Sequence, residues 1–200
     1  MKPFLIGLIT LLFTSAAMAQ TLTKAERKAA IQYINWSSKE LKKSLKGLSA
    51  EQLNYKPTPE RWSPQECLYH IAFSEGALRG ALDQALQAPA DPAAKAQLKM
   101  GDEDIKKMIT DRTNKIKTAE PFEPQNTGFK NNKEAIAAFK TQRAMLIDLV
   151  KTTTVDMRNH IVTLPFGQMD AYQFVLFIAG HTNRHTQQLN EVKTAAGYPQ

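Results

Sequence analysis

The chain has 200 residues, with 26 Lys and Arg against 19 Asp and Glu, one Cys and four His. This length suits a single domain with its own core. A composition that is 42% hydrophobic with only 9 Gly excludes a disordered or low-complexity chain. The single Cys excludes an intrachain disulfide and a zinc site built on several thiolates. Any metal site within the chain must therefore use His and carboxylate ligands.

The first nineteen residues have the features of a cleaved signal peptide. Lys2 supplies a positive charge, an uncharged apolar run covers 4–13, and Ala17 and Ala19 are the small residues of a cleavage site. This run is shorter than the about 20 residues that a transmembrane helix needs, although a retained N-terminal anchor is the alternative. We therefore expect residues 20–200 to be exported to the periplasm or the medium, with no stable membrane anchor after cleavage.

Helical periodicity and capping signals predict the helices of the mature chain. Thr23 with Glu26 and Ser63 with Glu66 have the spacing of capping boxes, and Pro64 occupies a first helical position, where it loses no hydrogen bond. Apolar residues then recur every three or four positions. The predicted helices cover approximately 23–46, 63–86, 102–112, 131–150 and 170–196.

The remaining segments are predicted to be loops. Prolines interrupt 50–63 and 87–101, Pro165-Phe166-Gly167 is a turn, and no alternation typical of a sheet extends beyond a few residues. Four long amphipathic helices with unequal connections indicate an all-α four-helix bundle. The long connection between the second and third of these helices lets them run in the same direction.

Two histidines lie four residues apart on the last predicted helix. His181 and His185 share one helix face, with Cβ atoms about 5–6 Å apart, and continue its apolar stripe into the bundle. Two imidazoles at this spacing can chelate one ion. Two core histidines bonded to carboxylates are the alternative explanation for this pair.

A third ligand must come from another helix. His70 lies in the middle of the second helix among apolar residues, whereas His160 lies in the connection before the last helix, beside Arg158, where exposure to solvent is expected. We therefore predict His70, His181 and His185 as the metal ligands and His160 as a surface or loop residue. Three His ligands leave coordination positions open to water or substrate.

Two motifs resemble those of a known family, the DinB-like superfamily of metal-binding four-helix proteins. The resemblance covers the mature chain in motif order and spacing. The first motif is Arg61-Trp62-Ser63-Pro64, Glu66 and His70-Ile71, and the second is Pro165-Phe166-Gly167, Gly180-His181, Arg184-His185 and Gln188.

The resemblance implies a divalent ion, zinc or nickel, bound by the three histidines at one end of a pocket. Members of the family include thiol transferases that use bacillithiol, a mycothiol-dependent isomerase and metal-dependent hydrolases, and homodimers are expected. Its name implies no DNA repair. The signal peptide departs from the better-known members and weakens the transferase interpretation, because low-molecular-weight thiols are cytosolic. The 102–124 insertion is expected to reshape the pocket.

Other residues near the motifs have structural and functional interpretations. Glu75 is a candidate second-shell or acid/base group. Glu66 is already explained by its capping box, and Cys67 is more simply a buried small side chain than a ligand or nucleophile. Trp62 lines the pocket mouth or fastens its loop to the core. Arg184 points away from the ligands, and a salt bridge to another helix is expected before binding of a substrate anion.

The charge pattern does not favour a nucleic-acid partner. The Lys residues are dispersed over several helices, without a basic stripe interleaved with aromatics. Glycine-rich phosphate loops and GxSxG nucleophile turns are absent from the sequence. The sequence thus predicts an exported metal-dependent enzyme, hydrolase or transferase, that acts on a small molecule. A non-catalytic metal- or ligand-binding protein is the alternative, followed by a bundle that binds no metal.

Overall fold

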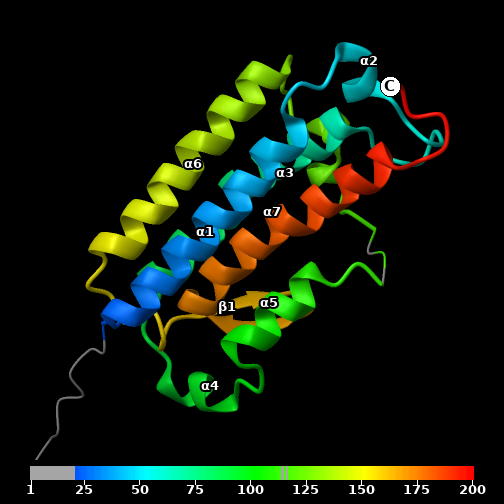
Figure 1. Cartoon of the computed structure of the whole chain (residues 1–200). Helices are drawn as coiled ribbons and strands as arrows, with labels where there is room; N and C mark the ends of the chain where they lie inside the picture. The colour runs from blue at the N-terminus through cyan, green and yellow to red at the C-terminus, as the bar shows by residue number, and fades with distance from the viewer. Residues whose placement is uncertain (1–20, 114, 116) are drawn as a thin grey trace, which may run out of the picture.

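The computed structural model describes residues 21–113, 115 and 117–200. Four long helices form a bundle (Figure 1): α1 (Lys24–Leu45), α3 (Pro64–Gln87), α6 (Asn132–Thr152) and α7 (Ala171–Lys193). Both α1 and α3 pack against α6 and against α7. The long connection crosses from one end of the bundle to the other, so α3 and α6 run in the same direction, as predicted. The predicted signal peptide, 1–19, lies outside the described residues.

Side-chain caps fix where the bundle helices begin. Ser63 accepts the backbone N–H of Glu66 at 3.1 Å, and the Glu66 carboxylate accepts the Ser63 N–H at 2.8 Å. The same reciprocal pair starts α1 at Thr23 and α7 at Asp170. Each cap satisfies backbone donors that a helix end leaves unpaired. The predicted starts of these helices are therefore confirmed.

Short elements lie between the bundle helices. The predicted helix near 102 is α5 (Asp102–Thr110). The predicted loops 50–63 and 87–101 are wrong in part, because α2 (Ala50–Asn54) and α4 (Pro92–Gln97) form there. These helices of five and six residues end before a hydrophobic period repeats. Two 3₁₀ turns, η1 (Glu120–Phe122) and η2 (Pro124–Asn126), follow α5.

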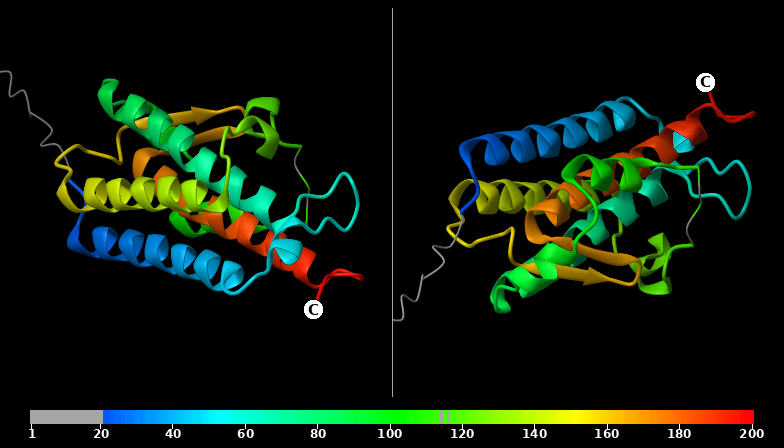
Figure 2. Two further views of the ribbon diagram at one scale, coloured as in Figure 1. Left: turned by 90° about the horizontal axis from the view of Figure 1, so that it is seen from above. Right: turned by 90° about the horizontal axis from the view of Figure 1, so that it is seen from below.

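A β-hairpin precedes α7, where no sheet was predicted. Strands β1 (Ile161–Leu164) and β2 (Gly167–Asp170) pair antiparallel, with Val162 opposite Met169, and Figure 2 shows them on the side of the bundle away from α1. Four residues are too few for alternation to stand out in sequence. The predicted Pro165-Phe166-Gly167 turn is confirmed, and Gly167 has φ +147°, a conformation that favours glycine.

The last helix, α7, is buried on nearly every side because α1, α3 and α5 contact it. Its apolar residues pack with those of α1, α3, α5 and α6 in the main core, in which Phe174, Ile178 and Ile34 are fully buried. The polar residues at 182–186 of this helix are therefore buried against other protein groups. The site is built on this helix.

Helix α5 approaches α7 closely at Gly180. A methyl group added to Gly180 would lie 2.3 Å from Cγ2 of Ile109 and 3.2 Å from the hydroxyl oxygen of Tyr33. Such contacts force α5 outward or Ile109 out of its rotamer. Glycine at this position is therefore a packing requirement rather than a helix defect.

We expect Gly180→Ala to lower the free energy of unfolding by about 1–3 kcal/mol, although alanine ordinarily favours a helix. Gly80→Ala is the matched control, because Gly80 lies exposed within α3 and an added methyl group meets nothing within 4 Å. The free energy of unfolding of the control should rise by about 0.5–1 kcal/mol. Urea unfolding of both variants tests this, and equal effects would contradict the packing explanation.

Arg158 connects three elements through their carboxylates. Its guanidinium lies 2.8 Å from Glu26 at the start of α1, 2.8 Å from Asp102 at the start of α5 and 3.1 Å from Asp170, the cap of α7. It also stacks over the Tyr172 ring at 4.1 Å. Hydrogen bonds from Arg158 hold the pKa of Asp102 below its ordinary value.

Arg158→Met should flatten the pH dependence of stability. The lowered pKa of Asp102 stabilises the fold above the unfolded carboxyl pKa of about 3.9, and this contribution is lost as pH falls through the lower folded pKa. The wild type should therefore lose unfolding free energy more steeply than the variant below about pH 5. Urea unfolding from pH 7 to pH 2 measures this, with exposed Lys140→Met as control. Parallel curves for wild type and Arg158→Met would refute it.

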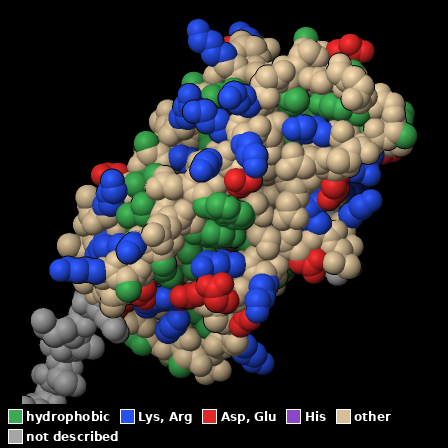
Figure 3. Space-filling model, in the orientation of Figure 1, with side chains coloured by type: hydrophobic (Ala, Val, Ile, Leu, Met, Phe, Trp, Pro, Cys, Tyr) green, Lys and Arg blue, Asp and Glu red, His purple; other side chains and the backbone are tan. Residues whose placement is uncertain are grey.

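The outer surface is mixed in character. On the face shown in Figure 3, Lys and Arg are scattered among apolar and uncharged atoms, with a group of acidic side chains near one end. Among the described residues, no helix is long and apolar enough to cross a membrane.

Candidate metal centre

The three predicted ligands meet between α3 and α7. Nε2 of His70 lies 3.1 Å from Nε2 of His185 and 3.4 Å from Nε2 of His181. In the described part of the chain they form the one group of His, Cys, Asp or Glu whose ligand atoms could hold an ion, all within 4.8 Å. The structure thus brings His70 together with the His181–His185 pair, and metal binding by the three stays a prediction.

In His70 and His185, the other ring nitrogen, Nδ1, forms a hydrogen bond to an oxygen acceptor. Nδ1 of His70 donates to the backbone oxygen of Phe122 at 2.7 Å, and Nδ1 of His185 donates to Oε1 of Gln188 at 2.9 Å. A carbonyl oxygen only accepts, so each Nδ1 carries the hydrogen. In a neutral ring Nε2 then presents a lone pair, and these lone pairs point at one another.

Burial keeps the three rings neutral. Removal from water lowers the pKa of His70, and it lowers the pKa of His181 and His185 much further, with added repulsion from the neighbouring ring. The lone pairs of His70 and His185, on nitrogens 3.1 Å apart, repel unless a cation lies between them. Two nitrogens bound tetrahedrally to one Zn²⁺ at about 2.0–2.1 Å lie about 3.3 Å apart. The donor set therefore fits a divalent metal.

Aromatic rings enclose the histidines. The Trp62 ring lies 4.9 Å from His70 and 5.8 Å from His185 between centroids, and Phe177 stacks 6.3 Å from His181. Trp62 also packs on the core cluster beside α3, so it both lines the site and fastens its loop. Ser74, one turn after His70, places its hydroxyl 3.5 Å from the Nε2 of His70.

The other candidates on α3 lie outside the histidine group. Cys67 is fully buried in the core, and burial raises the pKa of its thiol, which favours its interpretation as a small apolar side chain. Glu66 closes the α3 cap and pairs with Lys56. Glu75 is buried and accepts from Arg143 at 2.5 Å and from Thr182 at 2.7 Å. An acid/base role for Glu75 stays a prediction.

The predictions for His160 and Arg184 need correction. His160 is buried, not exposed, and its Nδ1 bonds the backbone oxygen of Ala85 at 3.0 Å, because the hairpin folds this connection onto the end of α3. Arg184 reaches another helix as expected, but the partners seen there are the backbone oxygens of Ile109 and Asp111. A cation suits the C-terminal end of α5, where carbonyl oxygens lack helical partners.

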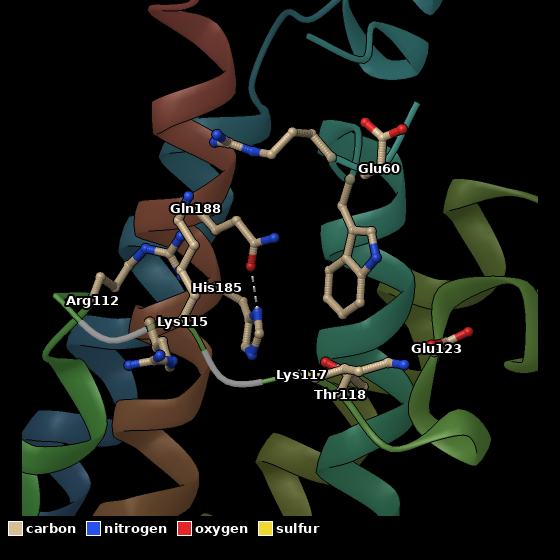
Figure 4. Close-up of a pocket in the computed structure, with 11 residues that line it drawn as sticks. Glu60, Arg112, Lys115, Lys117, Thr118, Glu123, His185 and Gln188 are labelled. Carbon is tan, nitrogen blue, oxygen red and sulfur yellow. Dashed lines mark hydrogen bonds between the residues drawn. The ribbon is translucent and has the colours of Figure 1, made fainter. Parts of the chain in front are cut away.

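Two cavities open beside the histidines. The basic cavity, about 320 Å³, is lined by Trp62, Gln188 and charged side chains (Figure 4), and the apolar cavity, about 440 Å³, is lined mainly by hydrophobic residues. His185, Arg184, Lys117 and Thr118 belong to both walls, whereas His70 and His181 face the apolar cavity. The 102–124 insertion contributes Met108, Arg112 and Phe122 to these walls, and its expected reshaping of the pocket stays a prediction.

Several residues of the site were not predicted from sequence. Phe122 acts through its backbone oxygen, which carries no residue-type signal. Ser74 follows His70 by one turn, and Gln188 follows His185 by three residues, so helical spacing was the available clue for both. Gln188 stood in the second motif without an assigned role.

The comparison with sequence families identifies the fold family. The sequence model of the DinB superfamily matches residues 33–189. The chain belongs to the DinB superfamily. This match spans all three histidines and both motifs, so the resemblance drawn from those motifs is confirmed.

Two similar proteins come from Bacillus subtilis. The uncharacterized protein YuaE of strain 168 is 29% identical over 152 residues, which cover 74% of this chain and 88% of YuaE. The solved structure of YfiT, described as a probable metal-dependent hydrolase with an unusual four-helix bundle topology, matches with a TM-score of 0.59 at 14% identity, over 90% of this chain and 93% of that one. At that identity YfiT supports the DinB-superfamily fold alone.

Proposed function

We propose that this chain is an exported metal-dependent hydrolase that acts on a small molecule. His70, His181 and His185 hold a divalent ion, with zinc or nickel as the expected metals. The convergence of the three Nε2 atoms, with that of His70 3.1 Å from His185 and 3.4 Å from His181, carries the proposal. The description of YfiT as a probable metal-dependent hydrolase agrees with it.

The residues around the histidines orient the rings, exclude water and offer a hydroxyl group to the substrate. An ion held by three imidazoles supplies Lewis-acid chemistry, which polarises a carbonyl and lowers the pKa of water. Phe122 and Gln188 orient the rings through Nδ1. Trp62 and Phe177 exclude bulk water from the rings, which strengthens electrostatic interactions there. Ser74 offers a hydroxyl beside His70 to a bound substrate.

Turnover by the mature chain tests the proposal. Residues 20–200 are loaded with Zn²⁺ or Ni²⁺ and offered panels of esters, amides and thiol–acceptor pairs, with the chelated chain as control. Hydrolysis that needs the metal supports the proposal. Thiol transfer in place of hydrolysis would assign a transferase, and metal binding without turnover of any panel would assign a non-catalytic binding protein. Either result overturns the proposed activity.

Export is tested on the protein made from its full sequence. Cleavage after Ala19 leaves a chain that begins at Gln20 and is found outside the inner membrane. Intact mass of the protein from each cell fraction measures this. Replacing Ala17 and Ala19 with Leu should block cleavage. The same replacement at Ala25 and Ala29, which are exposed and lie outside the recognition sequence, should leave processing unchanged. A full-length protein in the cytosol would refute export.

A further inference from the structure

Two cavities of opposite character share one wall, to which the histidine site contributes His185. Arg184, Lys117 and His185 line both of them. A molecule that spans both cavities has one part in the basic cavity and the other part in the apolar cavity. Its middle then lies against the histidines. The volumes, about 320 and 440 Å³, fall in the range of small-molecule sites.

The basic cavity carries an excess of positive charge. Its cations are Arg61, Arg112, Lys115, Lys117 and Arg184, and its acids are Glu60 and Glu123. Glu191, outside the wall, pairs with Arg112 at 2.6 Å and with Arg61 at 3.6 Å. Even with Glu191 counted, cations exceed acids by two.

Most of the charges are separated within this cavity. In Figure 4, Arg112 and Lys115 lie on one side of His185, whereas Glu60, Glu123 and Lys117 lie on the other. An anion is therefore stabilised on the side of Arg112, close to His185. Arg112 is held in place there by two hydrogen bonds to the Glu191 carboxylate, so its guanidinium keeps a fixed position on the wall.

The apolar cavity explains an exposed aromatic ring. Phe166, at the tip of the hairpin, is 58% exposed, yet it stacks on Phe177 at 5.6 Å and lines this cavity. Leu78, Met108, Phe122 and Leu164 line the same cavity. Hydrophobic groups gathered around an open cavity favour an apolar ligand segment, which removes their surface from water.

We propose that the substrate is an anionic amphiphile: an acyl ester or amide with its acyl chain in the apolar cavity and a carboxylate or phosphate on the leaving group in the basic cavity. This inference rests on the proposed function. The acyl carbon then lies beside the histidines. Hydrolysis forms a bond from the water oxygen to that carbon and breaks its bond to the leaving oxygen or nitrogen. The leaving atom keeps the electron pair and takes a proton from the water, with no redox change.

Binding of ether analogues tests the ligand class without turnover. The probes are (octyloxy)acetate and 2-(octyloxy)ethyl phosphate, which separate the two anions, with (octyloxy)acetamide as the neutral match and methoxyacetate as the short-chain match. Calorimetry on the metal-loaded mature chain, below the micelle concentration, gives each affinity. At least one anionic octyl probe should bind about tenfold more tightly than the amide. Each added methylene that is buried should strengthen binding about fourfold.

Variants of exposed residues test which cavity binds the anionic group of the probe and which binds its octyl chain. Lys115→Gln with Lys117→Gln should remove most of the preference for the anion, whereas Lys140→Gln, an exposed α6 lysine outside both cavities, should not. Phe166→Ala should weaken the octyl probes about fivefold and leave methoxyacetate unchanged. Because these side chains are exposed, the variants are expected to fold.

Three results overturn this inference: equal affinity for the anionic probes and the amide, no dependence on chain length, or an anion preference that survives loss of both lysines but disappears in His181→Gln. The last would place the anion on the metal. If binding follows the predicted pattern and no ester or amide is hydrolysed, the proposed activity fails while the ligand class stands. If hydrolysis occurs with no preference for anionic octyl substrates, the ligand class fails alone.

Discussion

Replacing His181 with Gln will remove stoichiometric metal from the mature chain. The wild type should retain about one divalent ion per chain after dialysis against metal-free buffer, and the variant far less. Loss of one of three imidazoles leaves two donors, and even loss of a group that only orients a ligand costs about 10–100-fold in metal affinity. We therefore expect affinity to fall by more than about 100-fold, measured by elemental analysis and by chelator competition.

His160→Gln is the matched control, because His160 is also a buried histidine but bonds Ala85 at the far end of α3. It should keep the wild-type metal content. Gln188→Ala should bind metal about tenfold more weakly than the wild type, but more tightly than His181→Gln, because it removes the acceptor of His185 Nδ1. Metal should also raise the melting temperature of wild type and His160→Gln but not of His181→Gln. A wild type with far less than one ion under metal-replete conditions would refute the site.

Replacing Arg143 with Met will cause the largest loss of stability. Arg143 of α6 is buried and donates to Glu75 of α3 at 2.5 Å, to the hydroxyl of Thr182 of α7, and to Ser37 of α1 at 3.3 Å. One guanidinium thus connects all four bundle helices. Burial raises the pKa of Glu75 and lowers that of Arg143, so each charge depends on the other.

Removing one member of a buried ion pair leaves the other charge uncompensated, which costs about 3–5 kcal/mol. Arg143→Met should therefore lower the melting temperature by roughly 10 °C in a domain of this size. Glu75→Met with Arg143→Met removes both charges and should recover most of the loss. Urea unfolding of Arg143→Met, Glu75→Met and the double variant gives the coupling energy between the two side chains. A double variant as unstable as Arg143→Met alone would contradict a mutually dependent pair.

The pair also bears on Glu75 as a candidate acid/base group. Glu75 follows His70 by five residues, and Thr182, its second partner, directly follows His181. In the double variant, metal content separates the two roles. Retained metal with lost hydrolysis would support an acid/base role, whereas retained metal with retained hydrolysis would leave Glu75 its part in packing the four helices.

The sequence alone determined the parts of this protein that depend on local interactions. Helix starts at Ser63 and Asp170 follow from capping side chains within the next turn, and the His181–His185 pair follows from the helical period. His70 was the one remaining histidine within a predicted amphipathic helix. These features need no knowledge of how helices pack, because each is a property of a single turn or a single helix face.

Only the tertiary structure decided which distant groups meet. Phe122 reaches His70 through a backbone oxygen, Arg143 finds Glu75 across the bundle, and the hairpin buries His160, none of which a residue type or a local period encodes. The basic and apolar cavities likewise join α3, α5, α7, the hairpin and the connection after α5. Long-range contacts arise from packing, which is why the sequence pointed to the three histidines while the walls around them required the fold.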